Sequence, residues 1–501
     1  MCQFTITVSV SATEKDSPLA HALGTVLEAG VQRLVSCVVR FLSQGISPRA
    51  MFAFEESLRE IGRELLRALE ECVLQHVEPA ERDAAPARIR TSMVDEYRCR
   101  PKSKLSLATL FGVVTVYRFL YESLLEGEPS MFPLDSWTGV EAGHVSPALA
   151  EKIARLAADN TQGELRKTLE HEHGVKLSVD RLRTVVAGVS QRIAPFVLEA
   201  RVQRLVQLLE AAFSSRGKHP PTLAIGRDGC DIPIRDEKYK VASAATVSVL
   251  DRRGKRLGTV YLGQMPQENQ VSLTAELSEL LQGALAAWSG PPPRLAYITD
   301  SGYQETHYWS ILRKMRHPVT QERLAWERIV DFYHVCQYVN RLGVALFGEG
   351  REATRWFRKM RRLLRDEPRG AYRVLSSASA LQTTRGPLHG RQLEEYEDCF
   401  RYLSKRLRFT DYFNYRRRGL PIGSGVTEAA CKIVFTQRFK RSGMTWKRDS
   451  GQHVLLLRTL TLSGLWPTVY QASLADASQP EKTFTQRANG PLTHVVLHNA
   501  A

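Results

Sequence analysis

Apolar residues recur at intervals of three and four along the N-terminal part of the chain, which is the spacing of one face of a helix. The stripe is continuous from Pro48 to His76, with glutamate and arginine on the other face, and a further helix is expected across residues 20–43. Such a stripe is typical of a packing helix and also of one that self-associates. Residues 92–125 alternate between apolar and polar positions and predict a small β-hairpin. Glu78–Pro86 is interpreted as a linker, and Phe132–Asp135 as a turn.

Helical spacing resumes in the next part of the chain. One helix is predicted from Thr161 to His173, followed by a turn at Gly174, a helix that is capped by Ser178 and runs to Gln191, and a further helix at Glu199–Ser214. A helix, a glycine-containing turn and a second capped helix form the outline of a helix-turn-helix, whose second helix would present Arg181 and Arg183 to DNA. Plain helical packing explains the same outline, so the pattern leaves both alternatives open.

The middle of the chain changes to short apolar runs separated by turn residues, which predicts a sheet. Strands are predicted at residues 222–227, 240–250, 257–262, 294–299 and 326–330, with helices at 271–287 and directly after Asp300. Three strands, a helix, a strand, a helix and a strand follow one another in the ribonuclease H-like order. The fold class expected from the sequence is therefore α/β with a ribonuclease H-like catalytic core.

The predicted elements divide the chain into a mostly helical N-terminal DNA-binding region, the catalytic core and an all-helical insertion. The segments are a helical region at 1–90, a small β and linker region at 91–143, a helix-turn-helix-like domain at 144–200, the core at 216–334 and 420–466, a basic insertion at 335–419 and a tail at 467–501. The last helices are expected between residues 426 and 462, and a polar, loose tail is expected beyond residue 468.

With 43% hydrophobic and 24% charged residues among 501, the chain has the composition of a globular protein. Its 69 lysines and arginines exceed its 53 acids, and the resulting charge of +16 favours a polyanionic partner, nucleic acid first. None of the eight cysteines forms a Cys-x-x-Cys pair, which argues against a zinc ribbon and a disulfide framework. We recognise no signal peptide and no run of about 18 uncharged apolar residues, so we expect a cytoplasmic protein with no membrane partner.

One predicted helix of the insertion carries arginine on a single face. Arg351, Arg355, Arg358, Arg362 and Arg365 follow one another at spacings of four, three, four and three, and apolar residues take the other face. Few acids interrupt this row, which favours a surface that contacts phosphate. A solvated charged face is the alternative.

Three acids follow short apolar runs or a glycine-rich loop. Asp228 and Asp300 each end an apolar run and precede a glycine-containing turn, and Glu428 lies in the first turn of a helix after the loop Pro421–Gly425. Acids at the carboxyl ends of strands in an open sheet converge on a crevice, and three carboxylates together favour a hard divalent cation. Two Mg²⁺ ions about 3.5–4 Å apart, or Mn²⁺ in their place, would support phosphodiester hydrolysis and transesterification. Taken singly, each acid is also explained as a turn residue or a helix N-terminal carboxylate.

Five short motifs follow one another in the second half of the chain: Gly226-Arg-Asp-Gly229, Thr299-Asp-Ser-Gly302, Asp331-Phe-Tyr-His334, the run Gly419–Lys432 and the run Arg438–Trp446. Together they resemble bacterial insertion-sequence DDE transposases of the Kra type. The resemblance covers residues 222–466 well and 95–195 more weakly, and Gly-Ser-Gly-Val-Thr-Glu is its most specific part. Members of that family often carry a Cys-x-x-Cys pair near the position of Tyr121–Pro129, and this chain has none.

The resemblance implies roles for single residues. Asp228, Asp300 and Glu428 match the family's catalytic, metal-binding triad, and Asp331 and His334 match an Asp-x-x-His motif after the fifth strand. That pair would orient water or a leaving 3′-oxygen, and a buried, hydrogen-bonded structural pair is the alternative. Basic residues close behind the glutamate are further candidates for DNA contact: Lys432, Arg438, Lys440 and Arg441.

The expected function is that of a DNA transposase, which binds the terminal inverted repeats of an insertion sequence in double-stranded DNA, cuts at the ends and joins them to target DNA. Synapsis of two ends implies at least a homodimer. A ribonuclease H-like nuclease or resolvase without strand transfer uses the same chemistry. A repressor or domesticated transposase with an inactive site would only bind DNA.

Overall fold

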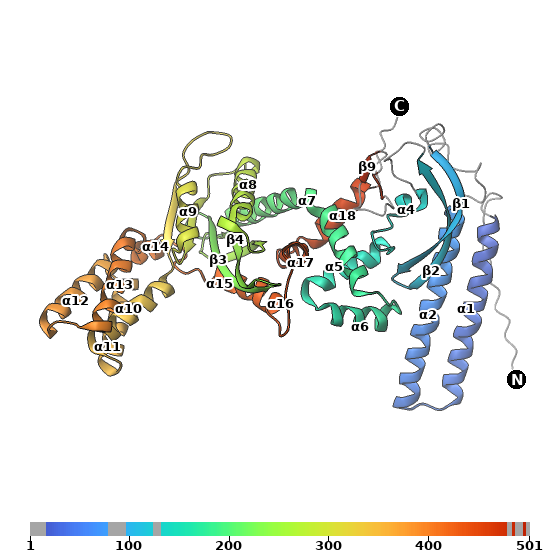
Figure 1. Ribbon diagram of the computed structural model, residues 1–501, viewed down its shortest axis with the longest axis horizontal. Coiled ribbons are helices and arrows are strands. Elements are labelled where there is room, and N and C mark those ends of the chain that lie inside the picture. Colours follow the sequence, from blue (N-terminus) through green and yellow to red (C-terminus); the bar gives the residue numbers. More distant parts are fainter. Residues whose placement is uncertain (1–16, 79–96, 124–131, 478–482, 486–493, 497–501) are drawn as a thin grey trace. The chain divides into compact units, whose positions relative to one another are not determined.

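The computed structural model describes residues 17–78, 97–123, 132–477, 483–485 and 494–496 (Figure 1). The chain forms two compact units, one made of Met1–Ala194 with Tyr470–Ala501 and the other of Pro195–Val469. The second is built on a mixed five-stranded sheet with many helices, so the fold is mixed α/β. Most of the predicted linker Glu78–Pro86 and most of Tyr121–Pro129 lie outside the described residues.

The first unit begins with a helical pair, α1 (Ser17–Ser43) and α2 (Pro48–Val77), which confirms both predicted helices. Ser47 caps α2 through its side-chain oxygen, and proline occupies the first turn, where its missing N–H leaves no hydrogen bond unmade. The predicted β-hairpin is confirmed as β1 (Tyr97–Thr109) and β2 (Gly112–Ser123), which pair antiparallel.

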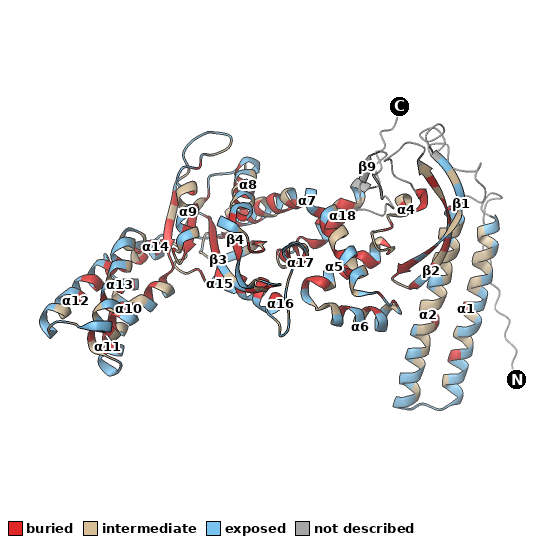
Figure 2. Ribbon diagram, viewed as in Figure 1, coloured by how far each residue is buried: buried red, intermediate tan, exposed pale blue. Residues whose placement is uncertain are grey.

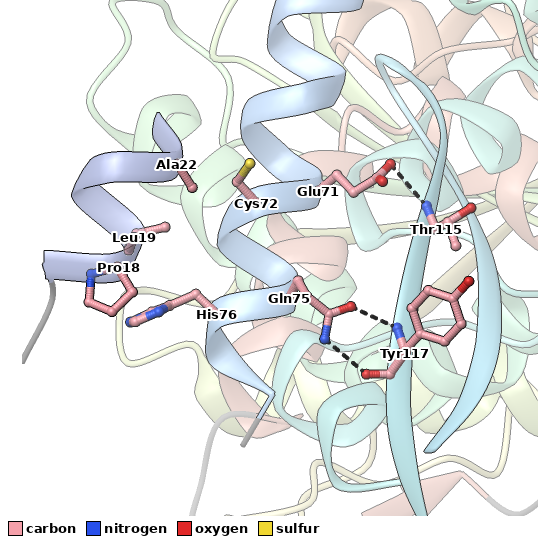
Figure 3. Close-up of a pocket in the computed structure, with 9 residues that line it drawn as sticks. All are labelled: Pro18, Leu19, Ala22, Glu71, Cys72, Gln75, His76, Thr115 and Tyr117. Carbon is pink, nitrogen blue, oxygen red and sulfur yellow. Dashed lines mark hydrogen bonds between the residues drawn. The ribbon is translucent and has the colours of Figure 1, made fainter. Parts of the chain in front are cut away.

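A shallow depression of about 550 Å³ lies where α1, α2 and β2 meet (Figure 3). Pro18, Leu19, Cys72 and Tyr117 are among the residues that line it. The side chain of Gln75 accepts a hydrogen bond from the Tyr117 amide at 2.9 Å and donates one to the Tyr117 carbonyl at 3.1 Å. These bonds satisfy backbone groups that a two-stranded sheet leaves open at its edge, and they attach α2 to the hairpin.

One helix, α1, meets the length and hydropathy criterion for crossing a membrane, although charged residues interrupt it and it contains no run of about 18 uncharged residues. Packing helices of soluble proteins and N-terminal signal sequences meet it as well, so α1 by itself assigns no location. The helix is compatible with a soluble protein, because it packs along α2 with the rings of Phe41 and Phe54 stacked at 4.5 Å.

Three longer helices follow: α5 (Pro147–Asp159), α6 (Gln162–His173) and α7 (Val179–Phe213), of which α7 continues beyond Ala194 into the second unit. Thr161 opens α6 with a capping box, in which its hydroxyl and the carboxylate three residues later satisfy each other's backbone amides. Gly174 closes the helix in the left-handed conformation that glycine adopts without strain. The predicted helices and turn are therefore present.

Three predictions about the helices need correction. A short helix, α4 (Pro133–Thr138), lies where only a turn was predicted. α7 runs through Pro195 without the break predicted between residues 191 and 199, because apolar packing on both sides outweighs one missing hydrogen bond. The tail predicted beyond residue 468 begins later, since α18 (Trp466–Ala477) continues with Tyr470 buried. The C-terminal strands are β8 (Thr483–Thr485) and β9 (His494–Val496), which pair antiparallel.

The sheet of the second unit has the strand order β5–β4–β3–β6–β7. The first three strands along the chain pair antiparallel, and the last two run parallel to β3. The predicted strands at 294–299 and 326–330 and the helix at 271–287 are confirmed to the residue. The strands are β3 (Thr222–Ile234), β4 (Lys238–Leu250), β5 (Arg256–Gln264), β6 (Arg294–Thr299) and β7 (Trp326–Val330).

Side chains alternate between the two faces of this sheet, so each face has its own apolar core. Tyr297 belongs to the core formed with α7, α8 (Val271–Ala287) and α9 (Tyr303–Leu312). Ala296 and Ile298 belong to the core formed with the helices that follow β7. Where both faces are covered, the strands are buried, as along Ala242–Leu250 of β4 and Leu295–Thr299 of β6, whereas the part of β4 at Lys238–Val241 is exposed. Figure 2 shows buried segments in the sheet beside exposed ones.

An all-helical segment follows β7, as predicted for residues 335–415. Its elements are α10 (Phe332–Phe347), α11 (Arg351–Asp366), α12 (Gly370–Arg385), α13 (Gly390–Arg406), η4 (Leu407–Phe409) and α14 (Tyr412–Arg417). The chain then returns to the sheet. The remaining elements of the unit are η3 (Glu268–Gln270), α15 (Gly425–Ala430), the π-helical η5 (Cys431–Thr436), α16 (Gln437–Phe439) and α17 (Arg448–Leu462).

Candidate functional site

Two aspartates, Asp228 and Asp300, lie just beyond the last paired residues of the parallel strands β3 and β6. The last paired residues of these parallel strands are Ile225 and Tyr297, and Asp228 and Asp300 each come three residues later. In two parallel strands, residues at the same distance beyond a paired position lie side by side. The two aspartates therefore lie at the same edge of the sheet. Both side chains are half-buried.

β3 does not end at Asp228, contrary to the prediction of a strand that stops before a glycine turn. The strand continues to Ile234 against β4, where Asp228 pairs with Ala244 and Gly229 with Ser243. The neighbouring strand supplies the hydrogen-bond partners for this extension, which the apolar run alone does not indicate. Asp228 therefore projects from a regular antiparallel ribbon, which holds it more firmly than a turn would.

α15 brings Glu428 to the same strands. The hydroxyls of Thr427 and Thr246, which lies on β4, are hydrogen-bonded at 2.8 Å. The Thr427 hydroxyl also occupies the place that a side chain on Gly226 of β3 would need. The Ser424 hydroxyl donates to the exposed Glu428 carboxylate at 3.0 Å. The helix is thus packed on the strand that carries the first acid, and it fits there because position 226 is glycine.

After α15 the helix widens into η5, and the wide turn begins at Cys431. Such π-helical turns are frequent at functional sites. The buried Cys431 thiol donates a hydrogen bond to the Asp228 carboxylate. Burial raises the pKa of this thiol, and the neighbouring charges of Asp228 and Glu428 raise it further, so the thiol stays protonated and remains a donor.

Burial raises the pKa of the Asp228 carboxyl above its ordinary value, and the negative charges of Asp300 and Glu428 raise it further. Hydrogen bonds from the Gly229 amide and the Cys431 thiol act in the opposite direction. The three acids therefore lie near enough for two of them to destabilise the charge on the third. A bound cation would relieve that repulsion.

The acids are near one another without being arranged as ready-made ligands. Within the described part of the chain, no three histidine, cysteine, aspartate or glutamate side chains are grouped so that they could hold a metal ion. Each carboxylate has its own local donor instead. Asp228 accepts the Gly229 amide at 2.7 Å, Asp300 accepts the Gly302 amide at 3.0 Å, and Glu428 accepts the hydroxyl described above. Repulsion between uncompensated charges favours these separate arrangements.

Asp331 and His334 have different surroundings. Asp331 is fully buried at the end of β7, where one carboxylate oxygen accepts the His334 amide at 2.6 Å and the other accepts the Ser424 amide. This carboxylate caps α10 and fixes the loop before α15. That is the arrangement expected if Asp331 and His334 are a buried, hydrogen-bonded structural pair. The half-buried His334 ring packs against Tyr338 and Tyr402, with centroids 5.3 and 5.9 Å away.

The helical insertion holds the loop after Asp300, a role that the sequence did not reveal. The Tyr402 hydroxyl donates to the Asp300 carbonyl at 3.0 Å, and the Arg406 guanidinium donates to the Ser301 carbonyl at 3.1 Å. The Tyr402 ring also stacks on Tyr338 at 3.6 Å and lies 3.8 Å from the Arg406 guanidinium. Ser301 has a φ of 66°, a left-handed conformation that costs a non-glycine residue about 1 kcal/mol. These contacts therefore stabilise a strained turn beside an acid.

A fourth acid, Glu305, lies in the first turn of α9. Its side chain is 8% exposed, and one of its carboxylate oxygens and one of Asp300 both lie within 3.5 Å of the position that a Cβ on Gly302 would take. Burial raises the pKa of Glu305, the charges of Asp300 and Asp228 raise it too, and Arg227 lowers it. The sequence pattern shows only a first-turn acid, so the fold is needed to place Glu305 in the acidic site.

Most candidate DNA-contacting residues of the second unit are exposed. On α11, apolar residues including Trp356 and Met360 are buried, and the opposite face presents the arginines Arg351, Arg355, Arg358 and Arg362. Lys432 and Lys440 are exposed close behind Glu428, and Arg441 is half-buried. The exposed arginines of α11 and the exposed Lys432 and Lys440 can therefore contact a polyanion.

Three of the candidate basic residues have contacts within the fold instead. Arg438 is buried, with its guanidinium 4.9 Å from the Trp446 ring. In the first unit, Arg181 donates to two backbone carbonyls of the loop before α5. Arg183 forms an ion pair with Asp180 at 2.9 Å. Sequence spacing alone does not separate such residues from exposed ones.

No family model matches the chain. A curated protein of Streptococcus gallolyticus, named UPF0236 protein in vanSb 3′ region, is 25% identical to it over 385 residues. The similarity covers 75% of this chain and 75% of that protein. Its name gives a position in a gene region and no activity, so the function has to be argued from the site.

We expect Gly226→Ala to destabilise the protein by about 1–3 kcal/mol, because the added Cβ would overlap the Thr427 hydroxyl and press on Thr246. Denaturant unfolding measures the change. Gly425→Ala is the matched control, since a Cβ there meets no atom within 4 Å and should change stability by less than about 0.5 kcal/mol. Equal stability of the two variants would show that α15 is not packed on β3 in this way.

We expect Asp228→Asn to raise the melting temperature near neutral pH when divalent cations are absent. Burial and two neighbouring acids raise the pKa of Asp228 in the folded protein, so folding disfavours its charged form. That cost is absent below the ordinary pKa of aspartate and is complete once the pH exceeds the raised pKa. Thermal unfolding across pH should therefore show a gain that vanishes toward about pH 3. The exposed Asp231→Asn on the same strand should show no such trend, and a less stable Asp228→Asn at neutral pH would contradict this explanation.

Proposed function

We propose that the protein is a DNA transposase whose second unit is the catalytic core. The observation that carries this proposal is the convergence of three acids, far apart in sequence, at one edge of a sheet. Asp228 and Asp300 share a strand-end position, and Glu428 reaches them on a helix packed against β3 and β4. Asp300 and Glu428 both act on the charge of Asp228. Carboxylates placed in this way suit divalent cations and phosphodiester chemistry.

The topology supports a ribonuclease H-like core. Three antiparallel strands are followed by two strands parallel to the first, with a helix before each of them. The first two acids follow the pairing of β3 with β6, next to each other in the strand order. An all-helical insertion separates β7 from α15, in the order that the resemblance to Kra-type transposases implies. The position of the acids in the sheet and the order of the elements along the chain therefore both support a ribonuclease H-like core.

The donor set fits Mg²⁺, with Mn²⁺ as the alternative. Asp228, Asp300 and Glu428 would hold two ions through hard oxygen ligands, and positive charge there would offset the repulsion that raises the pKa of Asp228. The chemistry supplied on binding is the activation of water or a 3′-hydroxyl and the stabilisation of the leaving oxygen. The chain's own part is positional: Asp331 fixes the loop before α15, and Tyr402 fixes the loop after β6.

The basic surface supports double-stranded DNA as the partner. The exposed arginine face of α11 would contact phosphates, and Lys432, one turn beyond Glu428, would contact a phosphate beside the acids. We propose that α6 and α7 of the first unit bind the terminal inverted repeats, with the arginines of α7 supporting the fold of that region. Synapsis of two ends and joining to target DNA would require at least two copies, and we place this activity in the bacterial cytoplasm.

Asp228→Asn, Asp300→Asn and Glu428→Gln should each abolish cutting of DNA and leave DNA affinity near wild type, because each keeps the shape of the site and removes a charged ligand. The substrate is DNA that flanks the coding region, incubated with Mg²⁺, and gel assays separate cut from joined products. Asp231→Asn on the same strand is the matched control and should cut normally.

Persistent cutting by any of the three variants would show that its acid is misassigned. Wild-type protein that cuts without joining would be a nuclease with this site. Wild-type protein that binds DNA and never cuts would be a repressor or an inactive relative, and the transposase proposal would fail.

Arg355→Ala with Arg358→Ala should weaken DNA binding and make the logarithm of the affinity fall less steeply with the logarithm of salt concentration, by about 2 in slope. The reason is that each lost phosphate contact removes about one released counterion. The matched control replaces Arg373 and Arg401, which are exposed but ion-paired to Glu367 and Asp398. A slope unchanged from wild type, or equal in the two double variants, would return α11 to a solvated charged face.

A further inference from the structure

The helical pair α1–α2 is apolar but little buried. Its buried residues are Gly30 and Cys37 of α1 and Ile61 of α2 (Figure 2). The most apolar 18-residue stretch of α1 has a mean hydropathy of 1.4, and 11% of that stretch is buried. A helix that is apolar on most sides is normally covered on most sides. The pair therefore presents a surface that a further partner would cover.

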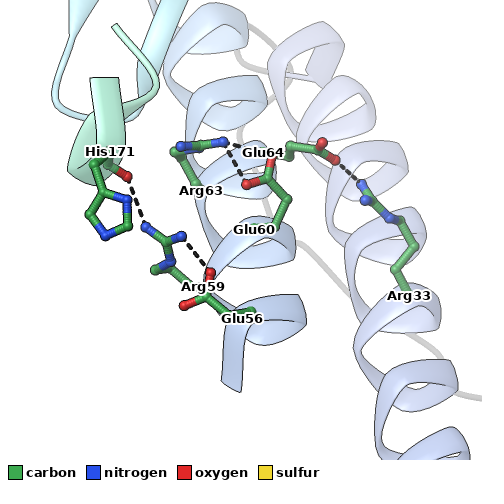
Figure 4. A network of polar contacts seen from close by, with 7 residues as sticks. All are labelled: Arg33, Glu56, Arg59, Glu60, Arg63, Glu64 and His171. Atoms are coloured by element: carbon green, nitrogen blue, oxygen red, sulfur yellow. Dashed lines mark hydrogen bonds and ion pairs between the residues drawn. The ribbon is translucent and has the colours of Figure 1, made fainter. Parts of the chain in front are cut away.

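Much of α2 already has partners in its own unit. Near its far end, Gln75 hydrogen-bonds the β2 backbone (Figure 3). In its first half, the Arg59 guanidinium donates to the His171 carbonyl at 2.8 Å (Figure 4). An ion pair between Arg33 and Glu64 connects the two helices midway along their length (Figure 4). The unexplained surface is at the other end, around the turn between α1 and α2.

Six exposed apolar residues within fifteen positions surround that turn, and we call them the tip patch: Val38, Val39, Leu42, Ile46, Met51 and Phe52. The exposed fractions reach 66% for Leu42, 87% for Ile46 and 67% for Phe52. The stacked rings of Phe41 and Phe54 hold the helices together beneath the patch, so its shape is preformed. Exposed apolar residues gathered in this way at one end of a helical pair mark an interaction site.

The charges beside the tip patch select its partner. Arg49 and Glu55 lie three residues before and three residues after Phe52, and all three are exposed. At about 1.5 Å per residue, each charge is about 5 Å along the helix axis from the aromatic ring. If two such helices met in parallel, like charges would face each other. If they met antiparallel with Phe52 against Phe52, each arginine would face the glutamate of the other copy. These two charges are thus complementary to those of a second copy in the antiparallel orientation and repel them in the parallel one.

We propose that the tip patch binds the tip patch of a second copy of this chain in a two-fold, antiparallel contact. A two-fold axis brings the same surface together from both copies, and self-complementary charge is what such an interface requires. Six apolar residues from each copy are fewer than the roughly 20–30 of a standard interface, so the self-association is expected in the micromolar range. This inference does not depend on the transposase proposal and would hold for a chain with any activity.

A lipid surface is the competing occupant, because α1 is apolar enough by composition to enter a membrane. The charge pattern distinguishes the two. A membrane with anionic headgroups would favour Arg49 and disfavour Glu55, and a second copy uses both charges equally. Exchanging the sign of each charge in turn therefore tests the assignment.

The experiment is sedimentation velocity of the full-length chain, freed of nucleic acid, over a range up to about 100 μM. Wild type should show a monomer–dimer equilibrium. Phe52→Glu should weaken dimerisation at least about tenfold, since it places two acids against each other in an apolar contact. Arg49→Glu and Glu55→Arg should each weaken it several-fold. Val319→Glu, at a site 67% exposed in the second unit, is the matched control and should dimerise as wild type does.

The decisive measurement mixes the Arg49→Glu and Glu55→Arg proteins. One then carries acids at both positions three residues from Phe52 and the other carries arginines at both, so a heterodimer should form at concentrations where neither dimerises alone. Damage to the fold would not be repaired by mixing, which separates recognition from stability. A monomeric wild type at about 100 μM, variants that dimerise as wild type does, or no heterodimer on mixing would overturn the proposal. Flotation with anionic vesicles that Arg49→Glu abolishes and Glu55→Arg strengthens, in a chain that stays monomeric, would assign the patch to a membrane instead.

Discussion

The position of the third acid depends on one buried carboxylate that joins the two ends of a long insertion. Asp331 accepts the amide of His334, where α10 begins, and the amide of Ser424, which is 93 residues away in sequence and precedes α15. A buried carboxylate that lost these donors would keep an uncompensated charge, at a cost of about 3–5 kcal/mol. The bond is therefore strongly favoured, and it brings the chain back to the sheet after five helices. Because the two ends are tied at β7, the helices between them can differ in detail without moving Glu428.

Charge repulsion between the three acids opposes folding. Contacts between uncharged groups around the acids offset this repulsion. Close packing of Thr427 against Gly226 and Thr246 holds α15 on the strands, although α15 carries an acid toward another acid. On the other side, the Tyr402 hydroxyl holds the Asp300 carbonyl in a turn that is itself strained. A core selected only for stability would contain neither the raised pKa of an aspartate nor a left-handed serine beside it. Their occurrence together is typical of a site kept for its chemistry.

Parts of the fold could be predicted to the residue because their signals are local. β6 is a short, mostly apolar run that is buried on both faces, and β7 ends in the buried apolar pair Ile329-Val330, so composition and flanking residues define their ends. The end of β3 could not be predicted, because Asp228-Gly229 has the sequence of a turn and extends only through pairing with β4. Pro195 within α7 misled in the same way, since tertiary packing outweighs the lost hydrogen bond. In each case the missing information is a contact with a segment distant in sequence.

The candidate site also contains residues that the local sequence reveals and residues that only tertiary contacts reveal. The three acids could be found from the sequence because each follows a recognisable apolar run or glycine loop. Glu305 and Tyr402 could not be found, since a first-turn glutamate and a tyrosine on a basic helix are common, and their importance arises from contacts with the loop at Asp300. Charge runs are the most ambiguous of all. Arg438 and Lys440 are two residues apart, yet the first is buried against an aromatic ring and the second is exposed to solvent. A basic run therefore indicates a polyanion partner for the chain as a whole. Which of its residues can contact that partner depends on which helix face the fold leaves exposed.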